Sequence, residues 1–246
     1  MADRYFVETP ITGDQATLIG PEAHHLLHVM RAQPGTEVAI FDGSGEEFLA
    51  VVDRSSRSEV QLRIVERRTI DRELPFSLTL AVALPKGDRQ KWLVEKATEL
   101  GVTRIVPLKT QRGVAQPVEQ ALTRLRRGVI EASKQCGRNR LMQIDEPVGW
   151  QTLIEQAADQ LRLLAHPKSA LPNGCVCEAT GTVSPLREAA STRGIVVAIG
   201  PEGGFTDDEV VAACNLGWQP IDLGRRILRV ETAAIALAAM LATGAD

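Results

Sequence analysis

Two glycine-rich turns near the C-terminus carry the residues best suited to bind a ligand. One is Gly200-Pro-Glu-Gly-Gly-Phe205, which follows the apolar run 195–199. The other is Leu223-Gly-Arg-Arg-Ile-Leu-Arg229, which leads into Val230-Glu-Thr-Ala233. Because glycine lets the backbone approach a ligand closely, both turns can present main-chain N–H and C=O groups. In open α/β sheets such turns lie at the carboxyl ends of strands, where ligands bind, so the pair predicts a pocket built largely from main chain.

The composition of the first turn favours a nucleoside with a small zwitterionic group over a polyphosphate. The turn lacks the Lys-Ser/Thr pair of a phosphate-binding P-loop, and the carboxylate of Glu202 would repel phosphates. Adenine, in contrast, can be recognised by main-chain groups without particular side chains. Directly after the turn, Thr206-Asp-Asp-Glu209 has the spacing of a capping box and predicts the start of a helix.

A cluster of basic residues lies between positions 124 and 140, although the net charge of the chain is −3. A helix is predicted over 117–136, because Leu122, Leu125, Val129 and Ala132 recur at helical spacing. The opposite face carries the basic residues Arg124, Arg127, Lys134 and, if the turn continues, Arg138. Such a stripe is either a solvated helix surface or a contact for a polyanion. The segment Gln135-Cys-Gly-Arg138-Asn139, which adds two amides and a cation, favours the polyanion.

The elements that must position these residues fall into two predicted domains, 1–72 and 73–246, with the polar stretch 66–75 at their boundary. The first domain reads as a small all-β barrel with strands at 36–41, 47–52 and 60–65. The second alternates strands and helices, which predicts a mostly parallel α/β sheet. Its strands are expected at 78–84, 103–108, 161–165, 195–199 and 220–223.

Composition and spacing exclude several classes of protein. The chain of 246 residues is 44% hydrophobic and 24% charged, which is typical of one or two globular domains. It shows no signal peptide and no apolar run long enough to span a bilayer, so a cytoplasmic protein without membrane contact is expected. His24, His25 and His28 share a short predicted helix, but no carboxylate or cysteine completes a ligand set. Packing or RNA contact is therefore expected there, and no metal site.

The two turns together resemble the signature of the ribosomal RNA small subunit methyltransferase E family of the SPOUT class. The resemblance covers nearly the whole chain, because shorter matches follow one another in the family's order. These matches are His24-His25-Leu26, Val29-Met-Arg31, Phe41-Asp-Gly-Ser-Gly45, Lys86-Gly87, Glu95-Lys-Ala-Thr-Glu-Leu-Gly101 and Glu131-Ala-Ser-Lys-Gln-Cys-Gly-Arg138. Lys134 departs from the family, whose members often carry an acid at this position, and the change is expected to affect RNA contact rather than chemistry.

The resemblance implies S-adenosylmethionine-dependent methylation of N3 of a specific uridine in 16S rRNA, free or within the small ribosomal subunit. It also implies a SPOUT-type parallel sheet with a C-terminal trefoil knot, a PUA-like N-terminal barrel and a homodimer. A cation beside the uracil carbonyl oxygens would stabilise the anion that develops there, and Arg138 is the first candidate, with Arg229 as its competitor. Glu231 is the candidate base, or it orients Arg229 instead.

The resemblance also assigns residues to the cofactor, while the basic residues of the chain are the candidates for contact with RNA. The cofactor residues are His166, Pro167, Ile199, Gly200, Gly203, Leu223, Gly224, Ile227, Leu228, Arg229 and Thr232. RNA is expected to contact basic residues of both domains through its phosphates. These residues are Arg4, Arg31, Lys86, Arg89, Lys91, Arg124, Arg127 and Lys134.

Three alternatives stay open at the level of sequence. One is a SPOUT methyltransferase that acts on another RNA position, such as a tRNA ribose 2′-hydroxyl. Another is a non-catalytic RNA-binding assembly factor, against which the glycine turns and Glu231 argue. The third is a nucleotide enzyme that binds phosphates, which would need a phosphate-binding lysine motif that the chain lacks.

Overall fold

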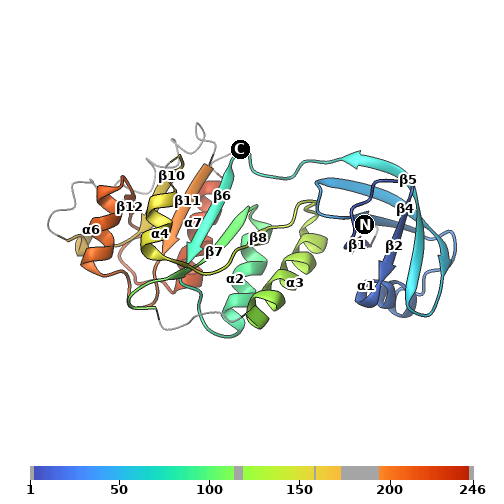
Figure 1. Cartoon of the computed structure of the whole chain (residues 1–246), viewed down its shortest axis with the longest axis horizontal. Coiled ribbons are helices and arrows are strands. Elements are labelled where there is room, and N and C mark those ends of the chain that lie inside the picture. The colour runs from blue at the N-terminus through green and yellow to red at the C-terminus, as the bar shows by residue number, and fades with distance from the viewer. Residues whose placement is uncertain (1–2, 114–118, 158, 173–193, 244–246) are drawn as a thin grey trace. The chain divides into compact units, whose positions relative to one another are not determined.

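The protein is described by a computed structural model that covers residues 3–113, 119–157, 159–172 and 194–243 (Figure 1). It divides into two compact units. The first unit comprises Met1–Glu73 and Ile130–Leu141, and the second comprises Leu74–Val129 and Met142–Asp246. The first unit therefore differs from the predicted domain 1–72 in taking up a segment from the middle of the chain.

The first unit is built on a five-stranded, barrel-like sheet in the order β1-β3-β4-β5-β2. Its strands are β1 (Arg4–Phe6), β2 (Gln15–Ile19), β3 (Glu37–Phe41), β4 (Glu46–Ser55) and β5 (Glu59–Thr69). The three predicted strands are confirmed as β3, β4 and β5, whereas β1 and β2 were not expected from the sequence. The pairs are antiparallel apart from β1 with β3. The histidine-containing segment forms the short helix α1 (Gly20–His24) and the π-helical turn η1 (His25–Val29).

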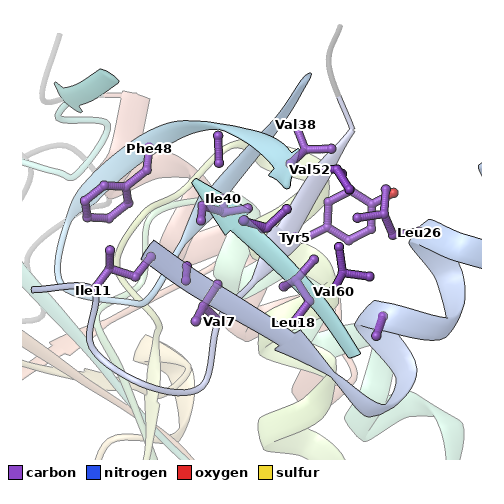
Figure 2. Close-up of a cluster of buried hydrophobic side chains, with 14 residues drawn as sticks. Tyr5, Val7, Ile11, Leu18, Leu26, Val38, Ile40, Phe48, Val52 and Val60 are labelled. Carbon is purple, nitrogen blue, oxygen red and sulfur yellow. The ribbon is translucent and has the colours of Figure 1, made fainter. Parts of the chain in front are cut away.

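The core of the first unit lies inside this curved sheet. Figure 2 shows Tyr5, Ile40 and Phe48 pointing into one cluster of buried side chains. Strand β5 begins with the alternation expected of a sheet that is solvated on one side. Val60 and Leu62 are buried and Ile64 is partly buried, whereas Gln61 and Arg63 are exposed. This packing fixes the strand register, since a slip by one residue would bring polar side chains into the core.

The second unit contains a parallel sheet in the order β12-β10-β11-β6-β7-β8, with β9 also paired to β7. Its strands are β6 (Ser77–Val82), β7 (Arg104–Lys109), β8 (Gln143–Ile144), β9 (Val148–Gly149), β10 (Leu161–Ala165), β11 (Gly194–Ile199) and β12 (Gln219–Ile221). The predicted parallel α/β sheet is thus confirmed, and each predicted strand is present. Every residue of β11 is buried, as expected for a central strand with both faces covered.

Helices cover both faces of the parallel sheet (Figure 1). On one face, Ala81, Leu164 and Val196 pack against Trp150 and Ile154 of α4 and against Val210 of α6. On the other face, α7 contacts β6 and β11, and α2 packs against α7. The helices of this unit are α2 (Asp88–Glu99), α4 (Trp150–Gln156), α6 (Asp207–Asn215) and α7 (Val230–Thr243). Helix α3 (Glu119–Cys136) begins in the second unit, and its residues from Ile130 on belong to the first. Within the described part of the chain, no helix has the length and apolar character to cross a bilayer.

Helix α3 contains the predicted amphipathic pattern but ends earlier than the basic stripe requires. Leu122, Leu125, Val129 and Ala132 are buried, as predicted. The predicted start at 117 lies outside the described residues. The helix ends at Cys136, and Gly137 then adopts a φ of 86°, a conformation that favours glycine. The chain changes direction there, so residues after Gly137 do not continue the helical stripe.

Candidate active site

Three neighbouring strands of the parallel sheet end at the same level and place their loops around one cavity. Ala165 at the end of β10 is the register partner of Ile199 in β11 and of Ile221 in β12. Both glycine-rich turns therefore leave the sheet at the same edge, next to the turn after β10. Together they enclose a cavity of about 850 Å³, which is within the range of small-molecule sites.

Most of the predicted cofactor residues line this cavity. The lining residues among them are His166, Pro167, Ile199, Gly200, Gly203, Leu223, Gly224, Ile227 and Leu228. The other two, Arg229 and Thr232, are exposed at the start of α7 and are not among the lining residues. The structure thus brings most of the set together, while its binding of a cofactor stays a prediction.

The loops after β10 and β12 are joined through Asp222, a residue that sequence reasoning missed. Its Oδ2 accepts a hydrogen bond of 2.9 Å from the Lys168 N–H, and its Oδ1 accepts one of 2.7 Å from the Gly224 N–H. The His166 ring Nε2 lies 3.0 Å from the Ala170 carbonyl oxygen, so this side chain stabilises its own loop. The loop conformations are consequently set by side-chain contacts, which leaves other main-chain groups for a ligand.

Arg112 holds the turn after β11 and was also missed. Its Nη1 donates to the carbonyl oxygens of Gly203 at 2.9 Å and Phe205 at 3.2 Å, and the residue lines the cavity. Next to it, the Gln111 N–H donates to Glu209 Oε1 at 2.9 Å. In the sequence, Arg112 is only a basic residue shortly after a predicted strand. Its position does not indicate that it binds carbonyl groups some ninety residues further along the chain.

Replacing Arg112 by methionine is expected to weaken S-adenosylmethionine binding about tenfold. Two hydrogen bonds from a charged donor stabilise the turn by roughly 1.5–3 kcal/mol, and their loss lets the turn leave its binding conformation. Titration calorimetry measures the dissociation constant directly. Arg124→Met, at an exposed arginine of the same unit that does not line this cavity, is the matched control. If Arg112→Met binds S-adenosylmethionine as tightly as wild type, the hydrogen bonds from Arg112 to this turn are not needed for cofactor binding.

Gly200 and Gly204 are glycines for different reasons. A Cβ at Gly200 would lie 2.9 Å from Phe205 Cε2, so the close approach of the aromatic ring excludes a side chain. Gly204 adopts a φ of 68°, which other residues rarely adopt. The predicted capping box is confirmed, because Thr206 Oγ1 accepts from the Glu209 N–H and Glu209 Oε2 accepts from the Thr206 N–H.

The predicted catalytic residues do not form one cluster in the second unit. Glu231 is buried in the first turn of α7, with its Oε1 3.6 Å from Arg89 Nη1. Arg229 is exposed just before this helix. Arg138 belongs to the first unit, where it is 3% exposed. Its Nε donates to Glu73 Oε1 at 3.0 Å, and its Nη2 pairs with the other oxygen of this carboxylate.

Arg4, predicted to contact RNA, belongs to the same buried network of the first unit. Its guanidinium pairs with Glu47, donates to Asn139 Oδ1 at 2.8 Å and lies 4.8 Å from the centre of the Phe41 ring. Burial lowers the pKa of Arg4, although the Glu47 carboxylate acts in the opposite direction. The side chain is only 10% exposed, so little of it is left for a phosphate.

The other predicted RNA residues differ in exposure. Lys134 is largely enclosed, and its Nζ donates to Glu22 Oε1 at 2.8 Å and to Glu131 Oε1 at 3.2 Å. Burial alone would lower the pKa of Lys134, but these two carboxylates outweigh it and raise the pKa above its usual value. The exposed members of the set are Arg31, Lys86, Lys91, Arg124 and Arg127. Arg89 is intermediate in exposure.

We therefore expect substitution of Lys134 to weaken RNA binding less than substitution of Arg127. Arg127→Gln should weaken RNA binding and reduce the slope of log affinity against log salt by about one, the effect of one lost phosphate contact. Lys134→Gln should leave this slope unchanged, because the ammonium is already neutralised by Glu22. Filter binding of 16S rRNA across a salt series checks both variants. A reduced slope for Lys134→Gln would show that its ammonium leaves Glu22 for RNA.

The lining of the 850 Å³ cavity suits a zwitterionic nucleoside derivative. Acidic and basic side chains line the cavity together with glycines and aliphatic residues. The acids are Glu202, Asp207 and Asp222, and the bases are Arg112, Lys168, Arg225 and Arg226. A ligand with an ammonium, a carboxylate and an adenosine group can find a complementary partner for each. S-Adenosylmethionine has this composition, so the described residues fit it.

Two family models match the chain. The model of an RNA methyltransferase domain matches residues 72–242, and that of an RNA methyltransferase PUA domain matches residues 18–65. The chain is 35% identical over 221 residues to ribosomal RNA small subunit methyltransferase E of Synechocystis, covering 88% of this chain and 69% of the relative. It is 29% identical to the Bacillus subtilis protein of the same name, covering 94% and 92% of the two chains.

Solved structures agree with these sequence matches. A putative methyltransferase from Legionella pneumophila in complex with S-adenosylmethionine is similar with a TM-score of 0.84 at 30% identity, covering 99% of this chain and 98% of that one. A ribosomal RNA small subunit methyltransferase E from Neisseria gonorrhoeae, bound to S-adenosylmethionine, is similar with a TM-score of 0.84 at 28% identity and the same coverage. The chain belongs to the ribosomal RNA small subunit methyltransferase E family.

Proposed function

We propose that this protein transfers the methyl group of S-adenosylmethionine to N3 of a specific uridine in 16S rRNA. The observation that carries the proposal is the 850 Å³ cavity at the ends of β10, β11 and β12, whose lining suits this cofactor in a chain of this family. Relatives that are bound to S-adenosylmethionine support the choice of cofactor. The uridine N3 position follows from the family resemblance of the two glycine-rich turns.

The chain's own residues have three tasks in this reaction. When bound, the cofactor supplies a methyl group that its sulfonium already activates, so the protein mainly aligns the reacting atoms. The turns after β10, β11 and β12 hold the methyl donor at the edge of the sheet. Other residues must place the uracil beside it and accept the proton from N3.

Of the predicted catalytic groups, Arg229 is the one that stays exposed beside the second turn. Arg138 is engaged by Glu73, and Glu231 lies beside Arg89 and does not line the 850 Å³ cavity. Exposed basic residues of both units, including Arg31, Lys86 and Arg127, are proposed to position the RNA through its phosphates. The target uridine must be unstacked to reach the methyl donor.

We further propose the finer features that the family resemblance implies. They are a homodimer, a trefoil knot in the C-terminal part of the sheet and action in the cytoplasm, where 16S rRNA is assembled. The dimer is checked by sedimentation of the purified chain.

Methyl transfer from labelled S-adenosylmethionine tests the proposed function. Wild-type protein is incubated with small ribosomal subunits or with naked 16S rRNA, and the modified position is mapped by mass spectrometry. Label on N3 of a single uridine in 16S rRNA supports the proposal, and the better substrate of the two defines the assembly state. Label on a ribose 2′-hydroxyl or on tRNA would overturn it, as would the absence of transfer together with failure to bind the cofactor in calorimetry.

A further inference from the structure

A second, smaller cavity lies beside the proposed cofactor cavity. Its volume is about 220 Å³, and Ala83, Leu84 and Pro85 form a buried apolar wall directly after β6. Strand β6 is the neighbour of β11, so this cavity opens at the carboxyl end of the same sheet. Pro201 and Glu202 line both cavities, which places the Glu202 carboxylate at their junction.

The polar groups of the smaller cavity come from two basic residues and one acid. Lys86 and Arg89 line it together with Glu202, and Arg89 Nη1 lies 3.5 Å from Glu202 Oε1. The same Nη1 lies 3.6 Å from Oε1 of Glu231, whose side chain is only 8% exposed. The guanidinium is consequently held between the first glycine-rich turn and the first turn of α7, where a buried carboxylate keeps it in place.

We propose that the smaller cavity is the subsite for the acceptor uracil, with Arg89 and Glu202 as the residues that recognise and activate it. Uracil presents an N3–H donor next to carbonyl acceptors, and the neighbouring guanidinium and carboxylate offer the complementary donor and acceptor. An apolar wall suits the faces of a base, whereas two nearby carboxylates, Glu202 and Glu231, disfavour a phosphate. Arg229 lines neither cavity, so it cannot take this place without movement. The inference rests on the proposed function and adds the residues that select the base.

In the proposed step, the methyl group moves from sulfur to uracil N3. A Glu202 oxygen takes the proton from uracil N3, and the nitrogen lone pair forms a bond to the methyl carbon. The bond between that carbon and sulfur breaks with its electron pair moving to sulfur, which leaves as a neutral thioether. Arg89 donates to a uracil carbonyl oxygen, where negative charge develops as the proton departs. Glu202 is 59% exposed, so its proton returns to solvent. Glu231 is a positioning residue that acts through Arg89.

Kinetics of Arg89→Met test the contact with the base. We expect kcat to fall on the order of 100-fold, as for loss of one donor to a developing oxyanion. The dissociation constant of S-adenosylmethionine and the salt dependence of the KM for RNA should stay as in wild type, because Arg89 does not line the cofactor cavity. Arg104→Met, at an exposed arginine of the same unit, is the control.

Two results would overturn the proposal. If Arg89→Met keeps the wild-type kcat but lowers the slope of log affinity for RNA against log salt by about one, Arg89 contacts a phosphate and not the base. A loss of S-adenosylmethionine affinity as large as the loss of kcat would also overturn the proposal, because it would indicate that Arg89 holds the turns of the cofactor cavity.

The pH dependence of Glu202→Gln tests the proton transfer. At neutral pH we expect a kcat about 100-fold below wild type, the contribution of a general base. The defect should shrink as the pH rises, because the N3 proton then leaves without help. Glu146→Gln, at an exposed carboxylate, is the control. A constant defect at every pH, or no defect, would overturn this role of Glu202. Both variants are compared with a wild type that has been shown to methylate uridine N3. If the wild type does not methylate this atom, the proposed function itself fails, and the wild-type assay shows this independently of the variants.

Discussion

Replacing Arg138 by methionine is expected to lower the free energy of unfolding by about 3 kcal/mol, the cost of removing one partner of a buried ion pair. The Arg138 side chain is 4% exposed and that of Glu73 is 18% exposed, so the carboxylate would stay enclosed without its counter-charge. Urea unfolding measures the loss. Arg63→Met, at an exposed arginine of the same unit, should change the free energy of unfolding by less than about 0.5 kcal/mol.

The double variant Arg138→Met with Glu73→Leu separates a structural from a catalytic role. Removing both charges should recover part of the stability, because no unpaired carboxylate remains. Methyl transfer by this variant should recover along with stability if Arg138 serves only the fold. Full stability in Arg138→Met together with a 100-fold loss of kcat would instead support the catalytic role that the sequence suggested.

Substitution of Gly200 by alanine is expected to weaken S-adenosylmethionine binding tenfold or more, with a loss of stability of about 1–3 kcal/mol from overpacking. The new Cβ would meet the Phe205 ring at 2.9 Å. That ring cannot retreat freely, because it is buried and its centre lies 4.5 Å from that of Trp150. Both side chains belong to the core behind the cavity, so their displacement moves the turn. Calorimetry and urea unfolding give the two quantities.

Gly203→Ala is the matched control for this prediction. Its Cβ would lie 3.4 Å from Arg112 Cβ, an ordinary contact, and the stability should change little. The double variant Gly200→Ala with Phe205→Leu should regain stability by removing the ring. Native affinity in Gly200→Ala would contradict the assignment of the 850 Å³ cavity to the cofactor.

The sequence predicted the sheet of the second unit well because its strands are short apolar runs that end at glycine, proline or polar residues. Strands β6, β7, β10 and β11 agree with their predicted ranges within one or two residues. In the first unit, β1 and β2 were missed. Strand β1 has three residues, too few for an alternating pattern, and β2 alternates with small or polar residues.

The environment of the predicted active-site residues was less accessible to sequence reasoning. Arg138 was assigned to the exposed stripe by extending the helical period, but α3 ends at Cys136 and the turn at Gly137 sends the side chain to Glu73. The contacts of Arg112 and Asp222 join segments far apart in the chain, for which periodicity carries no signal. Such contacts are set by the tertiary fold, whereas turns and caps are encoded locally.

The main-chain character of the cofactor cavity has a consequence for how this sequence can diverge. When a ligand is recognised by main-chain N–H and C=O groups, its affinity depends little on most of the surrounding side chains, provided that the backbone keeps its conformation. That conformation depends on a few positions, among them Gly200, Asp222 and Glu209. Substitutions at most positions of the cavity wall should therefore change the affinity little, whereas these few positions should tolerate almost no substitution.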